Sequence, residues 1–154
     1  MSLITDIQTI IKGLYPDATY TLSSKFKANV QSFIMETTEF PLIILNNEIA
    51  KNNEININNN ILKDTGIKIM ILSPDDVDNT DAQSEDIRQA MEDHADRIAV
   101  NIYQLLEVRP LSRQKYRTDP LFHVFNTNLT GVTLDMQVNY NEIVNFNKPV
   151  EDEV

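Results

Sequence analysis

The hydrophobic period changes along this 154-residue chain, and the order of those periods constrains the fold more than any other feature. Apolar residues recur with helical spacing from Leu3 to Leu14 and then alternate in short runs from Ala18 to Leu72. Helical spacing returns from Ser84 to Glu107, and alternation returns from Phe122 to Tyr140. A period near 3.6 is typical of a helix with one buried face, and a period of 2 is typical of a half-buried strand. The sequence therefore predicts a helix, several strands, one long helix and a final strand pair.

Both predicted helices have recognisable ends. Ser2 is a candidate N-cap for the first helix, and Pro16 ends it because proline disfavours the helical region for the residue before it. We expect the long helix to begin with Ser84 as its N-cap and to end before Pro110. The carboxylates that follow Ser84 would lie at the positive end of the helix dipole. The side chains expected to face the core are Ile87, Met91, His94 or Ala95, Ile98, Ile102 and Leu105.

The strand candidates differ in how their apolar residues are arranged. The run Leu42–Leu45 is apolar throughout, which is typical of a strand buried on both faces. Residues 54–57 alternate, as does Ile61–Leu72, the longest candidate, in which Gly66 suggests a bulge. Turn-forming residues at 128–131 precede the last alternating run and predict an antiparallel hairpin there.

The segment over residues 46–60 is rich in Asn and contains neither Pro nor Gly. Two interpretations stay open: a solvated hairpin arm that stands away from the core, or a variable surface loop. The residues expected to form such an arm are Asn52, Asn53, Glu54, Ile55 and Ile57.

Together these elements predict one α+β domain over residues 1–145, followed by a flexible acidic tail over residues 146–154. We expect a mostly antiparallel sheet with an N-terminal helix and one long helix packed on one face, plus a protruding hairpin arm. Chain length agrees with a single domain. No apolar run approaches the ~20 residues of a membrane-spanning helix, and no cleaved signal is expected.

Composition excludes several kinds of chemistry. The chain has no cysteine, so it has no disulfide and no thiolate ligand. Its formal charge of −10 argues against a general nucleic-acid binder, which must neutralise phosphates. The two histidines, His94 and His123, lack the spacing of a helical zinc pair, and the three glycines are isolated, so no phosphate-binding loop is present. The acidic stretch before the long helix does not match a calcium loop, since Asp81 and Ile87 replace the required Gly and Glu. We therefore expect no catalytic residue, no metal and no cofactor.

Charge is distributed unevenly. Nine carboxylates lie between Asp75 and Asp96, where the only basic residue is Arg88. Residues 109–117 are instead basic and are expected to form an exposed loop. We interpret the two segments as complementary surfaces that bring copies of the chain together, with solvated loops and a weak single-strand nucleic-acid contact as alternatives. The expected subunit-interface residues are Arg109, Arg113, Lys115, Arg117, Asp75, Asp76, Asp78, Asp81 and Glu85.

The order of elements over residues 65–106 and 121–140, with the sequence Asn-Leu-Thr-Gly-Val over residues 128–132, resembles a known family. This family comprises the tail-terminator and tail-completion proteins of tailed bacteriophages, together with the related neck-ring (head–tail connector) proteins. The resemblance covers most of the chain, although the arm is unusually polar and the acidic loop unusually long.

The resemblance implies a structural virion protein, made in the bacterial cytoplasm, that forms a ring of six or twelve copies at the neck or tail end. Neighbouring neck, portal or tail proteins would be its partners, and DNA would pass through the lumen. An acidic lumen carrying Asp75, Asp76 and Asp78 would let DNA slide without sticking. Two other classes stay open: a small-molecule-binding or enzymatic α/β domain, and a non-viral adaptor that binds one protein partner.

Overall fold

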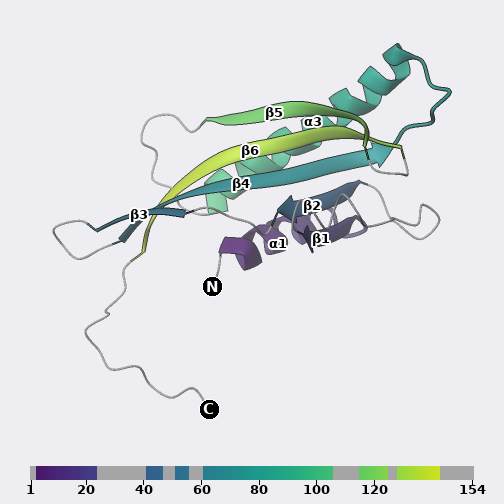
Figure 1. The fold of residues 1–154 in the computed structure, drawn as a ribbon. Coiled ribbons are helices and arrows are strands. Elements are labelled where there is room, and N and C mark those ends of the chain that lie inside the picture. The colour runs from purple at the N-terminus through teal and green to yellow at the C-terminus, as the bar shows by residue number, and fades with distance from the viewer. Residues whose placement is uncertain are drawn as a thin grey trace.

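The computed structural model describes residues 3–23, 41–46, 51–55, 61–105, 115–124 and 128–142. Within these residues the chain forms two helices and one mixed sheet, which confirms the α+β class (Figure 1). In chain order the elements are α1 (Leu3–Leu14), β1 (Thr19–Ser23), β2 (Leu42–Asn46), β3 (Lys51–Ile55), β4 (Ile61–Pro74), α3 (Asp81–Leu105), β5 (Tyr116–Val124) and β6 (Leu129–Glu142).

The sheet is built around β4 and β6, its two longest strands. These pair antiparallel along their full length, from Ile61 opposite Glu142 to Pro74 opposite Leu129. The strand order is β1-β2-β4-β6-β5, and only the β1–β2 pair is parallel. The expected antiparallel hairpin of the last two strands is confirmed, with an irregular register near the turn. The prediction of a mostly antiparallel sheet is therefore correct.

Strands β2 and β3 lie one after the other along the same edge of β4. Leu45 of β2 faces Ile69, and Lys51 of β3 faces Thr65. Leu45 and Lys51 are six positions apart, whereas their partners on β4 are four positions apart. The chain therefore carries two extra residues between β2 and β3. The strand expected over residues 54–57 instead begins at Lys51, and residues 56–60 lie outside the described part of the chain.

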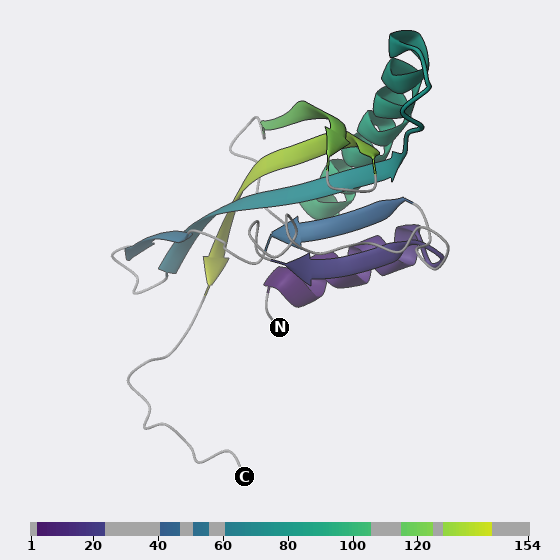
Figure 2. The same ribbon diagram turned by 45° about the vertical axis from the view of Figure 1, so that its right-hand side comes forward.

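Beyond the two helices the sheet continues as an arm. It consists of β3, the first half of β4 and the end of β6, which pair with one another over residues 51–55, 61–65 and 138–142. Figures 1 and 2 show this arm extending away from the part of the sheet that α1 and α3 cover. The predicted protruding arm is thus three-stranded at its base rather than a free hairpin.

Both helices pack on the same face of the sheet. Alternation along β4 turns Ile67, Ile69 and Ile71 toward this face, where each is fully buried, as expected. On α3 the core position is held by Ala95, while His94 is half-buried beside it. Each fully buried aliphatic side chain contributes about 1.5–3 kcal/mol, so this layer supplies most of the driving force for folding. The remaining buried members of this cluster are Ile7, Ile10, Ile11, Ile43, Leu45, Met91, Ile98, Ala99, Ile102, Val132, Leu134, Met136 and Val138.

A second apolar cluster lies on the opposite face. Leu42 and Ile44 of β2, Leu72 of β4 and Leu129 of β6 are fully buried there. Because Ile43 and Leu45 face the helices, β2 is buried on both faces. This explains why the run Leu42–Leu45 has no polar residue, as the sequence indicates.

Three local expectations are wrong. Helix α3 begins at Asp81 and is capped by Thr80, because the Gln83 backbone N–H donates to Thr80 Oγ1 at 3.2 Å and the Thr80 N–H donates to Gln83 Oε1 at 2.8 Å. Gly66 lies in continuous pairing with Gln137 and marks no bulge. Tyr116 and Arg117 belong to β5 rather than to a loop.

Candidate functional site

A buried carboxylate joins the end of β4 to the start of β6. Asp75 is 2% exposed. Its Oδ2 accepts a hydrogen bond from Thr130 Oγ1 at 2.7 Å, and its Oδ1 accepts one from Asn79 Nδ2 at 2.8 Å. His123 Nε2 lies 3.4 Å from the same Oδ2. The Asp75 cluster, defined as Asp75, Asn79, Ser84, His123 and Thr130, therefore ties the start of α3 to the β5–β6 hairpin.

Electrostatics show that this carboxylate is well satisfied. Burial by itself would raise the pKa of Asp75. Hydrogen bonds from Thr130, Asn79 and Ser84, together with the charge of nearby His123, outweigh burial and hold the pKa below its ordinary value. A carboxylate that is ionised and fully hydrogen-bonded in the interior is what a structural anchor requires. Ser84 and His123 both contact this aspartate.

Each residue of the Asn-Leu-Thr-Gly sequence at 128–131 has a structural task at this cluster. Asn128 has a φ of 50° and its carbonyl accepts a hydrogen bond from the Asp75 N–H at 2.9 Å. Leu129 fills the second apolar cluster. Thr130 Oγ1 accepts from the His123 N–H at 3.1 Å while donating to Asp75. Gly131 crosses β4 so closely that an added Cβ would lie 1.9 Å from Ile71 O.

One residue of the expected acidic interface, Asp75, is buried in the structure. Asp75 cannot present its charge to another molecule because it is buried, so placing it on the exposed acidic loop was wrong. Asp76, Asp78, Asp81 and Glu85 are exposed, as the interface interpretation requires. The acidic surface, defined as these four residues, occupies the loop before α3 and the first turns of that helix.

The expected basic surface is described only in part. Arg109 and Arg113 lie outside the described residues. Lys115 is exposed, and the side chain of Arg117 is 72% exposed on β5. Arg117 Nε lies 3.0 Å from Asp119 Oδ2 of the same strand, so part of its charge is compensated within the chain. Neither described basic residue contacts the acidic surface of the same molecule in any ion pair found among the described residues.

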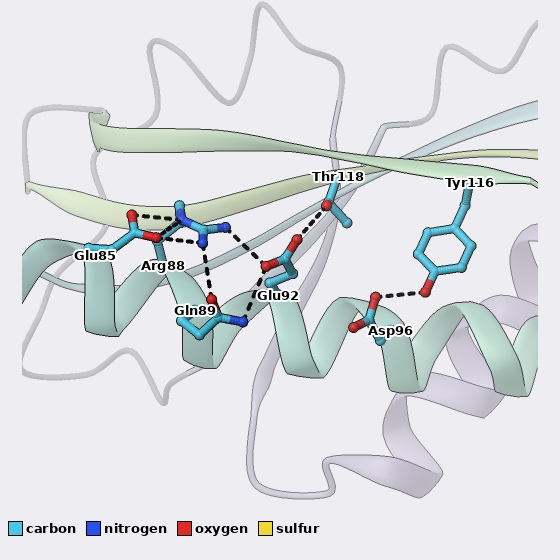
Figure 3. A network of polar contacts seen from close by, with 7 residues as sticks. All are labelled: Glu85, Arg88, Gln89, Glu92, Asp96, Tyr116 and Thr118. Atoms are coloured by element: carbon cyan, nitrogen blue, oxygen red, sulfur yellow. Dashed lines mark hydrogen bonds and ion pairs between the residues drawn. The ribbon is translucent and has the colours of Figure 1, made fainter.

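A polar network holds α3 against β5 (Figure 3). Arg88 lies between Glu85 and Glu92, at 2.6 Å and 3.1 Å, and the two carboxylates raise its pKa. Thr118 Oγ1 of β5 donates to Glu92 Oε1 at 2.8 Å. This hydrogen bond lowers the pKa of Glu92, and the hydrogen bond from Arg88 lowers it further. The network therefore uses part of the helix charge internally, which the sequence pattern did not reveal.

One turn further along α3, Tyr116 Oη donates to Asp96 Oδ1 at 2.7 Å, which raises the pKa of Tyr116 to about 12. This contact also fixes β5 to α3 (Figure 3). The aromatic residue that the sequence offered as a nucleic-acid stacking group is thus engaged within the chain, although it remains 41% exposed.

His94 belongs to a separate contact between the two helices. Its Nδ1 lies 2.8 Å from Tyr15 Oη, and the two rings meet edge to face with centroids 5.0 Å apart. Burial, followed by the charge of Arg97, lowers the pKa of His94. A neutral imidazole nitrogen can accept a hydrogen bond from the Tyr15 hydroxyl, so this histidine positions α1 on α3.

The described part of the arm exposes an apolar side chain. Ile55 is 74% exposed, the largest exposed fraction among the described large apolar residues. Asn53 and Glu54 beside it are exposed as well, while Asn52 lies in β3 and Ile57 falls outside the described residues. A single exposed isoleucine is common on protein surfaces, but this one lies on a strand at the edge of the described sheet, where another chain can pair.

Hollows lined by described residues are shallow. An open groove of about 410 Å³ runs between the ends of α1 and α3, and a smaller hollow of about 210 Å³ lies between α3 and β5 near Val100 and Tyr116. Neither contains an ionised side chain in its lining. Within the described ranges no group of three or more acidic or histidine residues could hold a metal ion. Neither described helix combines the length and apolar character needed to span a membrane. No protein-family model matches the chain, and no curated protein matches its sequence.

Proposed function

We propose that this protein is a structural virion protein that forms a ring of six or twelve copies at the head–tail interface or tail end of a tailed bacteriophage. DNA passes through the ring, and the subunit turns over no substrate. Other neck, portal or tail proteins contact its two open faces.

The observation that carries the proposal is the three-stranded arm. The arm extends past the helices, and its outer strand β3 exposes Ile55. In a lone subunit this side chain stays in water, at an unfavourable free energy of up to about 2–3 kcal/mol relative to burial. A neighbouring subunit that covers the arm removes that penalty, and head-to-tail contacts of this kind form rings when the rotation between neighbours closes.

Two further features support the same function. The Asn-Leu-Thr-Gly sequence behind the family resemblance holds the hairpin to β4, so its residues serve the fold. The acidic surface is exposed, and its Asp76, Asp78 and Asp81 are available to line a channel that repels DNA phosphates, whereas Glu85 is paired with Arg88.

The first test is the size and shape of the assembly. Light scattering and electron microscopy of the concentrated protein should show closed rings of six or twelve subunits. A monomer that instead binds a metabolite tightly would contradict the proposal and favour the small-molecule class.

The second test concerns the lumen. In the phage that encodes this protein, Asp76→Lys combined with Asp78→Lys should slow DNA ejection, because fixed positive charge in the channel binds phosphates. Asp17→Lys, which changes an exposed residue after α1, is the matched control and should leave ejection unchanged. Equal ejection in all three phages would remove the acidic surface from the channel.

A further inference from the structure

The groove between α1 and α3 has two unlike walls. Its α1 wall contributes Thr9, Ile10, Gly13 and Leu14, and its α3 wall contributes Asn101 and Gln104. The α1 wall is thus mostly apolar and the α3 wall is polar. A volume of about 410 Å³ falls within the roughly 300–1,000 Å³ of clefts that hold ligands.

Positive charge lies next to the α3 wall, outside the residues that line the groove. Arg97 is exposed and lies one turn before Asn101, whose Nδ2 donates to the Arg97 carbonyl oxygen at 2.8 Å. Residues four apart share a helix face, so Arg97 lies on the same stripe of α3 as Asn101. Its side chain makes a hydrogen bond to the Tyr15 hydroxyl, just past the end of α1. Asp93, the nearest carboxylate on that stripe, lies a further turn away.

The groove is open beside Gly13. A Cβ added there would meet no heavy atom within 4 Å, so the missing side chain leaves space rather than avoiding a clash. Gly13 has no positive φ, so the backbone does not require glycine at this position. A glycine in the last turn of a helix lowers its stability by about 0.5–1 kcal/mol relative to alanine.

The arm has the complementary pattern. Successive side chains of a strand point to opposite faces, so Ile55 and Glu54 of β3 point to opposite sides. A strand that enters the groove edge-on would turn Ile55 toward the apolar wall at Ile10 and Leu14. The same placement would turn Glu54 toward Arg97.

We propose that the arm of one subunit docks in the α1–α3 groove of a second copy, with Ile55 against α1 and Glu54 paired with Arg97. The arm and the groove are different surfaces of the chain, so each copy can give one contact and receive another. This contact rests on the proposed ring function and assigns the surfaces that build it. The Ile55 side chain supplies affinity, and the charge pair sets the direction of entry.

The test uses the absence of cysteine in the chain. Two proteins, each with one substitution, Asn53→Cys or Gly13→Cys, are mixed and treated with a short bismaleimide crosslinker, so that Ile55 stays in place. The mixed pair should crosslink at least about tenfold more than either protein alone, because docking raises the local thiol concentration to the millimolar range. The matched control pairs Asn53→Cys with Val77→Cys, an exposed position on the loop before α3.

Filling the groove is the second part of the experiment. Gly13→Ala adds a methyl group in open space and should leave assembly intact. Gly13→Phe should occupy the groove and reduce the assembled fraction at least about tenfold, as expected for the loss of a central contact. Both variants should melt at or above the temperature of the parent, which shows that the loss is not unfolding.

The outcomes separate this contact from the ring itself. Rings that form without crosslinking above the Val77→Cys control would overturn the contact and leave the proposed function standing. Crosslinked open chains without rings would support the contact and refute the ring. Absence of both crosslinks and oligomers would overturn the contact, and assembly of Gly13→Phe at the parent level would do the same.

Discussion

The two ends of the β4–β6 ladder differ in how completely the subunit satisfies them. At the hairpin end, the buried Asp75 carboxylate has hydrogen-bond donors on both oxygens, and Thr130 both donates and accepts. At the arm end, Asp64 Oδ1 and Thr65 Oγ1 are buried without a hydrogen-bond partner among the described residues. Apolar Ile55 is exposed on the neighbouring strand.

This difference shows at which end the buried polar groups find their hydrogen-bond partners within one chain. Buried polar groups in native proteins are nearly always hydrogen-bonded, and an unmade bond costs about 1–3 kcal/mol. The hairpin end meets this standard and so acts as the structural anchor of the domain. The arm end does not, and its exposed Ile55 agrees with the proposed role of the arm as a surface that a second copy covers.

The largest expected effect comes from adding one methyl group at the hairpin end. Gly131→Ala would place its Cβ 1.9 Å from Ile71 O, a backbone atom that cannot move aside without breaking the ladder. We expect a loss of about 3 kcal/mol or more in the free energy of unfolding, the upper end of overpacking effects.

Gly66→Ala is the control on the other half of the same ladder. There the added Cβ would lie 3.4 Å from Gln137 Nε2, the end of a flexible side chain. Urea unfolding should place this variant within about 0.5 kcal/mol of the parent. If the two alanine variants were equally stable, the close crossing at Gly131 would not be the constraint that we describe.

The next effect compares two buried threonines by the same substitution. Thr130→Val removes a donor from the buried Asp75 carboxylate and should cost about 2–3 kcal/mol. Thr65→Val removes a hydroxyl that has no partner in the described structure and should be neutral or stabilising by up to about 1 kcal/mol in the isolated subunit. Thermal melting of both variants measures the difference, and a destabilised Thr65→Val would show that the arm end is satisfied after all.

The smallest effect is the pH dependence of the anchor. The folded-state pKa of Asp75 lies below its ordinary value, so its contribution to stability is complete above the unfolded pKa of about 3.9. That contribution is lost as the pH falls through the lower, folded-state pKa. Asp75→Asn should therefore be less stable at neutral pH but should lose less stability on acidification. Parallel curves for parent and variant between pH 7 and pH 2 would contradict this account.

The sequence predicted the layers of the fold because burial leaves a periodic record. Alternation at Ile67, Ile69 and Ile71 and the unbroken run Leu42–Leu45 each identified strands with the correct faces buried. The start of α3 could also have been read correctly, since Thr80 and Gln83 form a capping box three residues apart. The preference for Ser84 placed the cap four residues too late.

The site was harder to predict because its partners are distant in the chain. Asp75 looked like one of several loop carboxylates, and only its contact with Thr130, 55 residues later, makes it an interior anchor. In the same way, Glu92 is one of a run of carboxylates in the sequence, and only the fold brings Thr118 and Arg88 into contact with it. Sequence identifies a charged residue, but its surroundings decide whether that charge is available to a partner.

The sequence by itself determined the helix and strand periods, the apolar faces and the absence of thiol chemistry, because these depend on local composition and spacing. Only the tertiary structure decided which carboxylate is buried, where β2 gives way to β3 in a shifted register, and which surfaces remain open. The physical reason is that hydrogen bonds and exclusion of water depend on neighbours in space, and strand pairing brings together residues that no local pattern connects.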